Sequence, residues 1–212
     1  MIYYNVVYVA TFVSSKDITM MTFIIIGDFI LNARLLDKVR LGKQRVEAIQ
    51  ILNAILNGGG WANHPIVIAW RHYINALKYY TNCIILEWVR RGGTNNLPLY
   101  EISGMIMVPW WSQWDRLHQS HRAMLMRKDP FYYHDKFTVD PEYNSYGYIW
   151  PDKVTYVTRD APLASITAPI PKELINPVYC GGHLKSGARA GSVCNRLVKD
   201  KQPYCKIHRK NH

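Results

Sequence analysis

Four side chains near the end of the chain have the types and spacing of a zinc site. Cys180, Cys194, Cys205 and His208 form the pattern C-x13-C-x10-C-x2-H. Structural Zn²⁺ sites take four thiolate or imidazole ligands in a tetrahedron, and a closing C-x2-H places two of them on one tight turn. His183 is an alternative ligand, because it also lies three residues after Cys180. The pattern therefore predicts a structural zinc ion, and the competing interpretation is three free thiols in a reducing compartment.

The same segment carries most of the excess positive charge. The chain has 212 residues and a formal net charge of +11, of which residues 178–212 contribute +7. Such a basic segment indicates a polyanionic partner, most often nucleic acid, although a solvated tail that only aids solubility has the same composition. The segment also resembles the zinc modules fused to proteins of large DNA viruses.

A second group of chemically active residues lies within one helical pattern. Residues 40–48 read RLGKQRVEA and place Arg40, Lys43 and Arg45 around a single acid, Glu47. One interpretation is a solvated helix face in which Lys43 pairs with Glu47 at i,i+4. The sharper hypothesis is a helix that faces nucleic acid and carries one functional carboxylate.

Four blocks of sequence resemble the pyrimidine-dimer DNA glycosylases of the phage endonuclease V type, and especially their bacterial and viral relatives. The blocks are residues 36–52, residues 63–65 together with Trp70, residues 87–92 (EWVRRG), and residues 116–133. They keep the family's order and spacing over about residues 21–150. The resemblance implies a DNA glycosylase that removes a damaged base and, as an abasic-site lyase, cleaves the strand.

The resemblance also implies which residues react. Members of the family use the α-amine of an N-terminal threonine as nucleophile, assisted by a glutamate on the first long helix; by position these match Thr22 and Glu47. Thr22 is internal here, so a free amine requires the chain to begin after Met21. We therefore expect residues 1–20 to be an extension that is absent from the working enzyme. Phage members carry arginines at the positions of Val46 and Gln50. Because this chain lacks them, the resemblance does not fix which DNA lesion is recognised.

The DNA contacts expected from the family likeness and from charge lie on three segments. His64 is a candidate active-site residue, with a helix-entry histidine bonded to backbone as the equal alternative. The aromatic side chains that could stack on bases are Trp110, Trp111, Trp114, Phe131, Tyr132 and Tyr133. Tyr132 and Tyr133 are preferred over the tryptophans because of the family likeness, and most of the chain's aromatics are expected in the core. The predicted DNA-binding residues are Arg40, Lys43, Arg45, His64, Arg116, Arg122, Lys128, Tyr132 and Tyr133.

Apolar periodicity shows which elements must position these residues. It predicts three long helices, over about residues 32–57, 65–91 and 112–128, followed by irregular, aromatic-rich loops. Residues 2–13 are apolar and β-branched, which is typical of a strand. The predicted fold class is mainly α, a compact bundle of three long helices with a small C-terminal zinc module.

The chain is expected to divide into four segments. These are an extension (1–20), a glycosylase-like helical domain (21–159), a proline-rich linker (160–177) and the basic zinc module (178–212). No apolar run is long enough for a membrane span, and the cysteine pattern suits a reducing intracellular compartment, whether cytoplasm, nucleus or a virion.

The expected partner is damaged, double-stranded DNA, and the reaction needs no cofactor beyond the structural zinc. The rival interpretation is a non-catalytic nucleic-acid-binding or packaging protein that retains the scaffold. A third is a glycosylase for a different lesion.

Overall fold

Six α-helices form most of the fold in the computed structural model, which describes residues 10–13, 20–151 and 164–165. The helices are α1 (Phe29–Leu35), α2 (Lys38–Asn57), α3 (Pro65–Trp70), α4 (Ile74–Arg90), α5 (Asp115–Lys128) and α6 (Pro130–Tyr133). Two 3₁₀ turns complete the helical part: η1 (Trp110–Gln113) precedes α5, and η2 (Pro141–Ser145) follows α6. The mainly helical class predicted from the sequence is confirmed.

The first predicted helix is two helices, α1 and α2, separated at Leu36 and Asp37. Both separating residues are extended, and the Asp37 carboxylate accepts hydrogen bonds from the backbone N–H groups of Val39 (2.8 Å) and Arg40 (3.0 Å). An aspartate that satisfies the free donors of a first turn starts a new helix. The expectation of one helix over 32–57 was therefore wrong, because apolar spacing continues across the cap.

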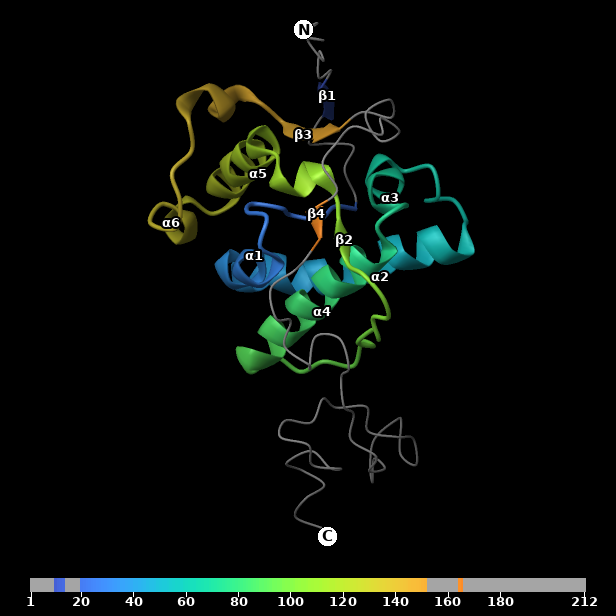
Figure 1. Cartoon of the computed structure of the whole chain (residues 1–212). Helices are drawn as coiled ribbons and strands as arrows, with labels where there is room; N and C mark the ends of the chain where they lie inside the picture. Colours follow the sequence, from blue (N-terminus) through green and yellow to red (C-terminus); the bar gives the residue numbers. More distant parts are fainter. Residues whose placement is uncertain (1–9, 14–19, 152–163, 166–212) are drawn as a thin grey trace, which may run out of the picture.

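The second predicted helix is also divided, into α3 and α4. His64 caps α3 and Pro65 occupies its first turn, while Tyr73 leaves the helical region (φ −126°, ψ 41°) before α4 begins. The break lets α3 pack on α2 separately from α4, which packs against both α1 and α2 (Figure 1). The third predicted helix, over 112–128, is η1 followed by α5, with Trp114 between them.

The described residues also form two short antiparallel pairs of strands. Strand β1 (Ala10–Val13) pairs with β3 (Tyr148–Pro151), which also packs on α5. Strand β2 (Met107–Val108) pairs with β4 (Ala164–Ser165). Strand β1 thus lies in the segment expected as an extension, and β4 lies in the segment expected as a linker.

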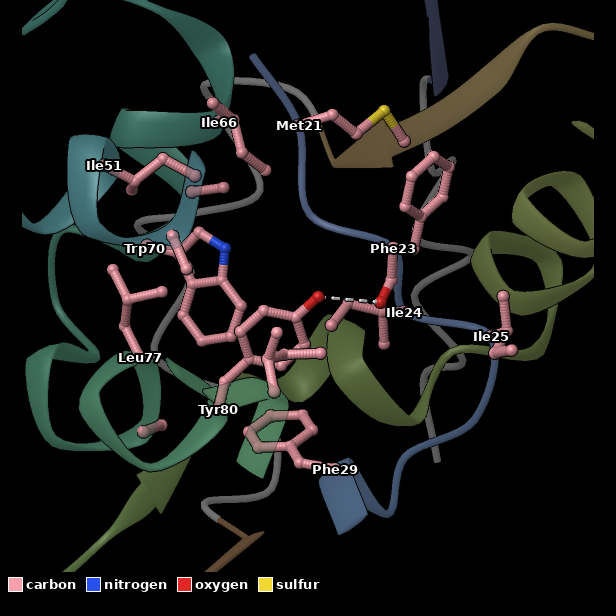
Figure 2. Close-up of a cluster of buried hydrophobic side chains, with 14 of the residues drawn as sticks. Met21, Phe23, Ile24, Ile25, Phe29, Ile51, Ile66, Trp70, Leu77 and Tyr80 are labelled. Atoms are coloured by element: carbon pink, nitrogen blue, oxygen red, sulfur yellow. Dashed lines mark hydrogen bonds between the residues drawn. The ribbon is translucent and has the colours of Figure 1, made fainter. Parts of the chain in front are cut away.

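An extended segment, residues 20–25, threads through the centre of the helices. Figure 2 shows Ile24 beside the buried Tyr80 ring, whose hydroxyl donates to the Phe23 carbonyl at 3.2 Å, whereas Ile25 lies away from the Trp70 and Tyr80 rings. This segment belongs to neither strand pair, so its backbone groups must find partners elsewhere. Buried side chains supply them, and these side chains build the site described below.

Arg91 fastens α1 to α4. Its guanidinium donates to the carbonyl oxygens of Leu36 (2.7 Å) and Arg34 (2.7 Å) at the end of α1, and its Nε donates to Glu87 Oε1 (2.7 Å). The carbonyls at a helix end have no partners within the helix, and a cation there is also favoured by the helix dipole. The EWVRRG block therefore has a structural role that places the start of α2.

Gly42 sets how closely α2 approaches α4. A β-carbon at this position would lie 3.1 Å from Cζ3 of the Trp88 ring, closer than ordinary van der Waals contact. The pyrrole edge of the same indole lies against Gly93, and the Arg45 guanidinium lies over the ring, with its carbon 4.2 Å from the centroid. A glycine inside α2, which weakens a helix by itself, is thus explained by packing.

Candidate active site

Glu47 is a buried carboxylate in the middle of α2, with 3% of its surface exposed. Its Oε2 accepts a hydrogen bond from Gln44 Nε2 at 2.8 Å, and the backbone N–H of Met21 also donates to the carboxylate. Its Oε1 lies 3.3 Å from Lys43 Nζ, an ion pair that makes no well-aligned hydrogen bond in the described structure.

Burial raises the pKa of Glu47, and Lys43, Met21 and Gln44 oppose the shift. Burial dominates because the Lys43 side chain is 59% exposed, so water screens its charge. A carboxyl group with a raised pKa, held by fixed donors, is suited to proton transfer nearer neutral pH than an ordinary glutamate.

Thr22 lies in the extended segment beside this carboxylate and is fully buried. Its hydroxyl oxygen accepts a hydrogen bond from Trp70 Nε1 at 3.0 Å. In the full chain its nitrogen is part of a peptide bond, and Met20 and Met21, at 4% and 5% exposure, are buried ahead of it. The structure therefore brings the two predicted reactive residues to one place, with the preceding methionines covering them.

Gln44 joins the two residues, and sequence reasoning did not single it out. Its Nε2 donates to the Met21 carbonyl (2.9 Å) as well as to Glu47, and its Oε1 accepts from the Phe23 N–H (3.0 Å) and the Tyr80 hydroxyl (2.6 Å). It is completely buried. Its signal in the sequence is a polar residue on the apolar face of α2, three residues before Glu47.

His121, on α5, is the second residue that sequence reasoning missed. Its Nδ1 accepts the backbone N–H of Ile24 at 3.0 Å, so the neutral ring carries its proton on Nε2. Full burial, followed by the charge of His118, holds the pKa of His121 well below its usual value. This neutral histidine holds the extended segment two residues after Thr22.

Three of the predicted DNA-binding cations, Arg40, Lys43 and Lys128, lie in the first half of α2 and at the end of α5, and Lys43 pairs with Glu47. Burial, followed by the charges of Arg40, Lys43 and Arg127, lowers the pKa of Lys128, whereas Glu47 opposes the shift. Arg40 Nη1 lies 3.5 Å from Asp37 Oδ2 at the start of α2. The charges of Arg40, Lys43, Arg127 and Lys128 therefore act on one another, and Arg127 also donates to the carbonyls of Asn144 and Tyr146; we call these four residues the cation cluster.

Arg45 and His64 are not part of this cluster by their contacts. Arg45 stacks on Trp88 and donates to Asn95 Oδ1 at 3.1 Å. His64 caps α3 through its Nδ1, which accepts from the Ile66 N–H at 3.3 Å, and burial lowers its pKa. His64 thus has the geometry of the helix-entry alternative.

The two predicted arginines of the first part of α5 lie apart from each other. Arg122 is half-buried, and its Nε donates to the Ile25 carbonyl at 2.8 Å, so it supports the extended segment. Arg116 is exposed and interacts with Tyr143 in η2.

Tyr132 and Tyr133 both contact the junction between α1 and α2. Tyr133 is fully buried; its hydroxyl donates to Asp37 Oδ2 at 2.5 Å and accepts from the Asp37 N–H at 3.0 Å. Tyr132 is half-buried, and its hydroxyl donates to the Leu36 carbonyl at 3.3 Å.

The predicted zinc ligands Cys180, Cys194, Cys205 and His208 lie outside the described residues. Within the described ranges, no three or more His, Cys, Asp or Glu side chains form a group that could hold a metal ion. In the same part of the chain, no helix combines the length and apolar character needed to cross a membrane.

Comparison with known proteins gives one family. Residues 20–101 match the model of the family described as pyrimidine dimer DNA glycosylase, and this range contains Thr22, Gln44, Glu47 and the block with Arg91. Searches of curated proteins and of solved structures gave no significant match.

Proposed function

We propose, from the match of residues 20–101 to the pyrimidine dimer DNA glycosylase family, that the protein is a DNA repair glycosylase with abasic-site lyase activity. One observation carries the proposal: the Gln44 side chain is bonded on both sides of Thr22 and also to Glu47. A nucleophile and a proton-transfer group must be held together in this way for covalent catalysis.

The proposed reaction uses the α-amine of Thr22 after the chain is cut between Met21 and Thr22. The amine nitrogen bonds to C1′ of the sugar while the bond between C1′ and the base breaks, so the base leaves with that electron pair and takes up a proton. Loss of protons from nitrogen and opening of the sugar ring give an imine. Removal of a proton from C2′ then expels the 3′ phosphate, and water hydrolyses the imine.

Glu47 has two tasks in this scheme. Its carboxylate stabilises the positive charge that develops on the sugar, and it accepts and returns protons during ring opening. An α-amine has an ordinary pKa of about 7.7–8.0, so a useful fraction is neutral at physiological pH. Cutting after Met21 also removes the backbone N–H group that donates to Glu47 and lowers its pKa.

Trapping with borohydride tests the proposal. A chain that starts at Thr22 and the chain that starts at Met1 are each incubated with ultraviolet-irradiated, abasic and undamaged duplexes. We expect a covalent adduct only from the trimmed chain on damaged or abasic DNA, and mass spectrometry should place it on the Thr22 nitrogen. Glu47→Gln should abolish adduct formation, whereas the exposed control Glu101→Gln should not.

The same experiment separates the competing functions. Binding to the duplexes without an adduct from either chain would support a non-catalytic nucleic-acid-binding protein, which the buried peptide nitrogen of Thr22 in the full chain favours. An adduct on abasic DNA but not on irradiated DNA would indicate a different lesion. Val46 and Gln50, where phage members have arginines, are both exposed on α2.

We also propose that residues 178–212 bind one structural zinc ion through Cys180, Cys194, Cys205 and His208. The basic residues around these ligands favour thiolates, and the module would add affinity for DNA that is independent of sequence and falls with salt. Metal analysis of the full chain should give one equivalent of zinc. Cys194→Ser should remove the zinc, and less than one equivalent in the unmodified chain would overturn the proposal.

A further inference from the structure

Trp70, the last residue of α3, donates its indole N–H to the hydroxyl oxygen of Thr22 at 3.0 Å. Both side chains are completely buried. A buried donor and a buried acceptor that pair with each other avoid the cost of leaving either group unsatisfied. Stability alone accounts for such a bond, so a role in the reaction requires further observations.

The first observation is that neighbouring rings hold the Trp70 indole in one orientation. The centroid of Trp111 lies 4.9 Å from that of Trp70, edge to face. Tyr80 and Phe29 lie on the same indole, with centroids at 5.8 Å and 6.1 Å (Figure 2). A buried ring packed against three others cannot turn without displacing them, because protein interiors are close-packed. The indole N–H is therefore a fixed donor for the Thr22 hydroxyl.

The second observation is that the peptide group after Thr22 is fixed by separate bonds. The Phe23 N–H donates to Gln44 Oε1 at 3.0 Å. The Phe23 carbonyl accepts from Asn32 Nδ2 at 2.9 Å and from the Tyr80 hydroxyl at 3.2 Å. These three side chains are completely buried. The backbone that leaves Thr22 is thus held without any contribution from its side chain.

Together these restraints determine where the Thr22 nitrogen lies. The Cα of an L-residue is tetrahedral with one handedness, so the direction of its nitrogen follows once the carbonyl carbon and Cβ are placed. In the full chain the peptide bond to Met21 also holds this nitrogen. A chain that begins at Thr22 lacks that bond, and rotation about the bond from Cα to the carbonyl carbon moves the nitrogen and Cβ together. The hydrogen bond from Trp70 opposes this rotation.

We propose that Trp70 is a positioning residue that holds the α-amine of Thr22 in the orientation in which it attacks C1′ of the sugar. The proposal rests on the proposed function, and Trp70 acts only through the Thr22 hydroxyl. Fixing a nucleophile before the reaction removes the entropy cost of orienting it during the reaction. The residue type also follows: a β-branched side chain has restricted rotation, so a threonine hydroxyl that is held in place also holds Cα.

Single-turnover trapping with borohydride on a saturating abasic duplex tests this role in chains that begin at residue 22. Trp70→Phe keeps a ring and removes the indole N–H, and we expect the trapping rate to fall about 10- to 100-fold. Thr22→Val breaks the same bond from the other end and should cause a similar loss, whereas Thr22→Ser keeps the hydroxyl and most of the rate. The double variant Trp70→Phe/Thr22→Val should be no slower than either single variant, because both remove one bond.

Affinity for a duplex with a tetrahydrofuran abasic-site analogue, which cannot react with an amine, separates orientation from binding. It should stay unchanged in Trp70→Phe and Thr22→Val, because the bond between these buried residues contacts no DNA. Thr22→Val changes the side-chain volume little, so it tests the same bond even where Trp70→Phe does not fold.

Trp111→Phe is the matched control. Trp111 is completely buried against Trp70, and its Nε1 has no hydrogen-bond partner among the described residues. The substitution makes the same change in volume in the same core without removing a bond to Thr22, so the trapping rate should not change. An equal loss in Trp111→Phe would overturn the proposal, because it would assign the effect to packing. Losses that multiply in the double variant would also overturn it.

The two proposals fail in different ways. If the unmodified chain that begins at Thr22 forms no adduct, the proposed reaction is wrong and the positioning role falls with it. If that chain reacts, and Trp70→Phe and Thr22→Val react at the same rate, the glycosylase stands and the positioning role is wrong.

Discussion

The amide nitrogen of Gln44 lies 2.8 Å from the carboxylate of Glu47, one helical turn further along α2. The same nitrogen reaches the Met21 carbonyl at 2.9 Å. The amide oxygen is also fully used, by Phe23 and Tyr80. One side chain thus fixes the distance between the candidate proton-transfer group and the segment that contains the candidate nucleophile.

Replacing Gln44 with methionine, which has a similar shape and no amide, should therefore be costly. The backbone groups of Met21 and Phe23 would be left buried without partners, at about 1–3 kcal/mol each, so we expect a loss of about 3 kcal/mol in the free energy of unfolding. Urea titration measures this. The exposed Gln50→Met on the same helix is the matched control and should change little.

Lys43→Met should change the pH dependence of adduct formation by the trimmed enzyme. Burial raises the pKa of Glu47 and Lys43 lowers it, so removing Lys43 raises that pKa further. Because the reaction uses the carboxylate, activity that is lost as the pH falls through the pKa of Glu47 will be lost at a higher pH in the variant. Trapping rates measured between pH 5 and 9 test this. Lys38→Met removes an exposed cation from the same helix, and an equal shift there would contradict the specific role of Lys43.

The buried histidines should make the fold sensitive to acid. Burial holds the pKa values of His121 and His118 below the ordinary value of about 6.5, so below that pH the unfolded chain binds protons that the folded chain does not. Stability is therefore fully present above about pH 6.5 and falls with decreasing pH, by up to about 1.4 kcal/mol per pH unit for each histidine. Unfolding free energies from urea titration at several pH values test this prediction. His121→Gln should reduce the slope, and the exposed His72→Gln should not.

Arg91→Lys should destabilise the protein although it keeps the charge. An ammonium group cannot reach the carbonyls of α1 and the carboxylate of Glu87 together, because those contacts use the spread nitrogen atoms of the guanidinium. We expect a loss of about 1–3 kcal/mol, because the network is only partly buried. Arg90→Lys is the control, since Arg90 is exposed and, among the described residues, its guanidinium is bonded only to Glu87. A thermal melt that shows equal loss for both variants would contradict the structural role of Arg91.

Much of the helical fold followed from apolar spacing, and the pairing of Glu47 with Thr22 followed from the family likeness. The spacing could not show that Asp37 interrupts a continuous apolar pattern, because a cap acts through two hydrogen bonds that leave periodicity unchanged. Nor could it place Gln44 or His121, whose roles depend on where the segment 20–25 crosses α2 and α5. Arg45 shows the same limit: its charge suggested a phosphate contact, whereas its face of α2 meets Trp88.

The absence of a side chain at Gly42 affects the hydrogen bonds of Glu47 as well as the contact with Trp88. Since a β-carbon at Gly42 would lie 3.1 Å from the Trp88 ring, a Gly42→Ala variant requires this ring, and with it the contact between α2 and α4, to shift by a few tenths of an ångström. Glu47 lies on α2, while Tyr80, which bonds Gln44, lies on α4, so the separation of these helices is transmitted to the hydrogen bonds that hold the carboxylate. Gly42 thus sets the separation of α2 and α4, and through it the position of the Glu47 carboxylate five residues further along the helix.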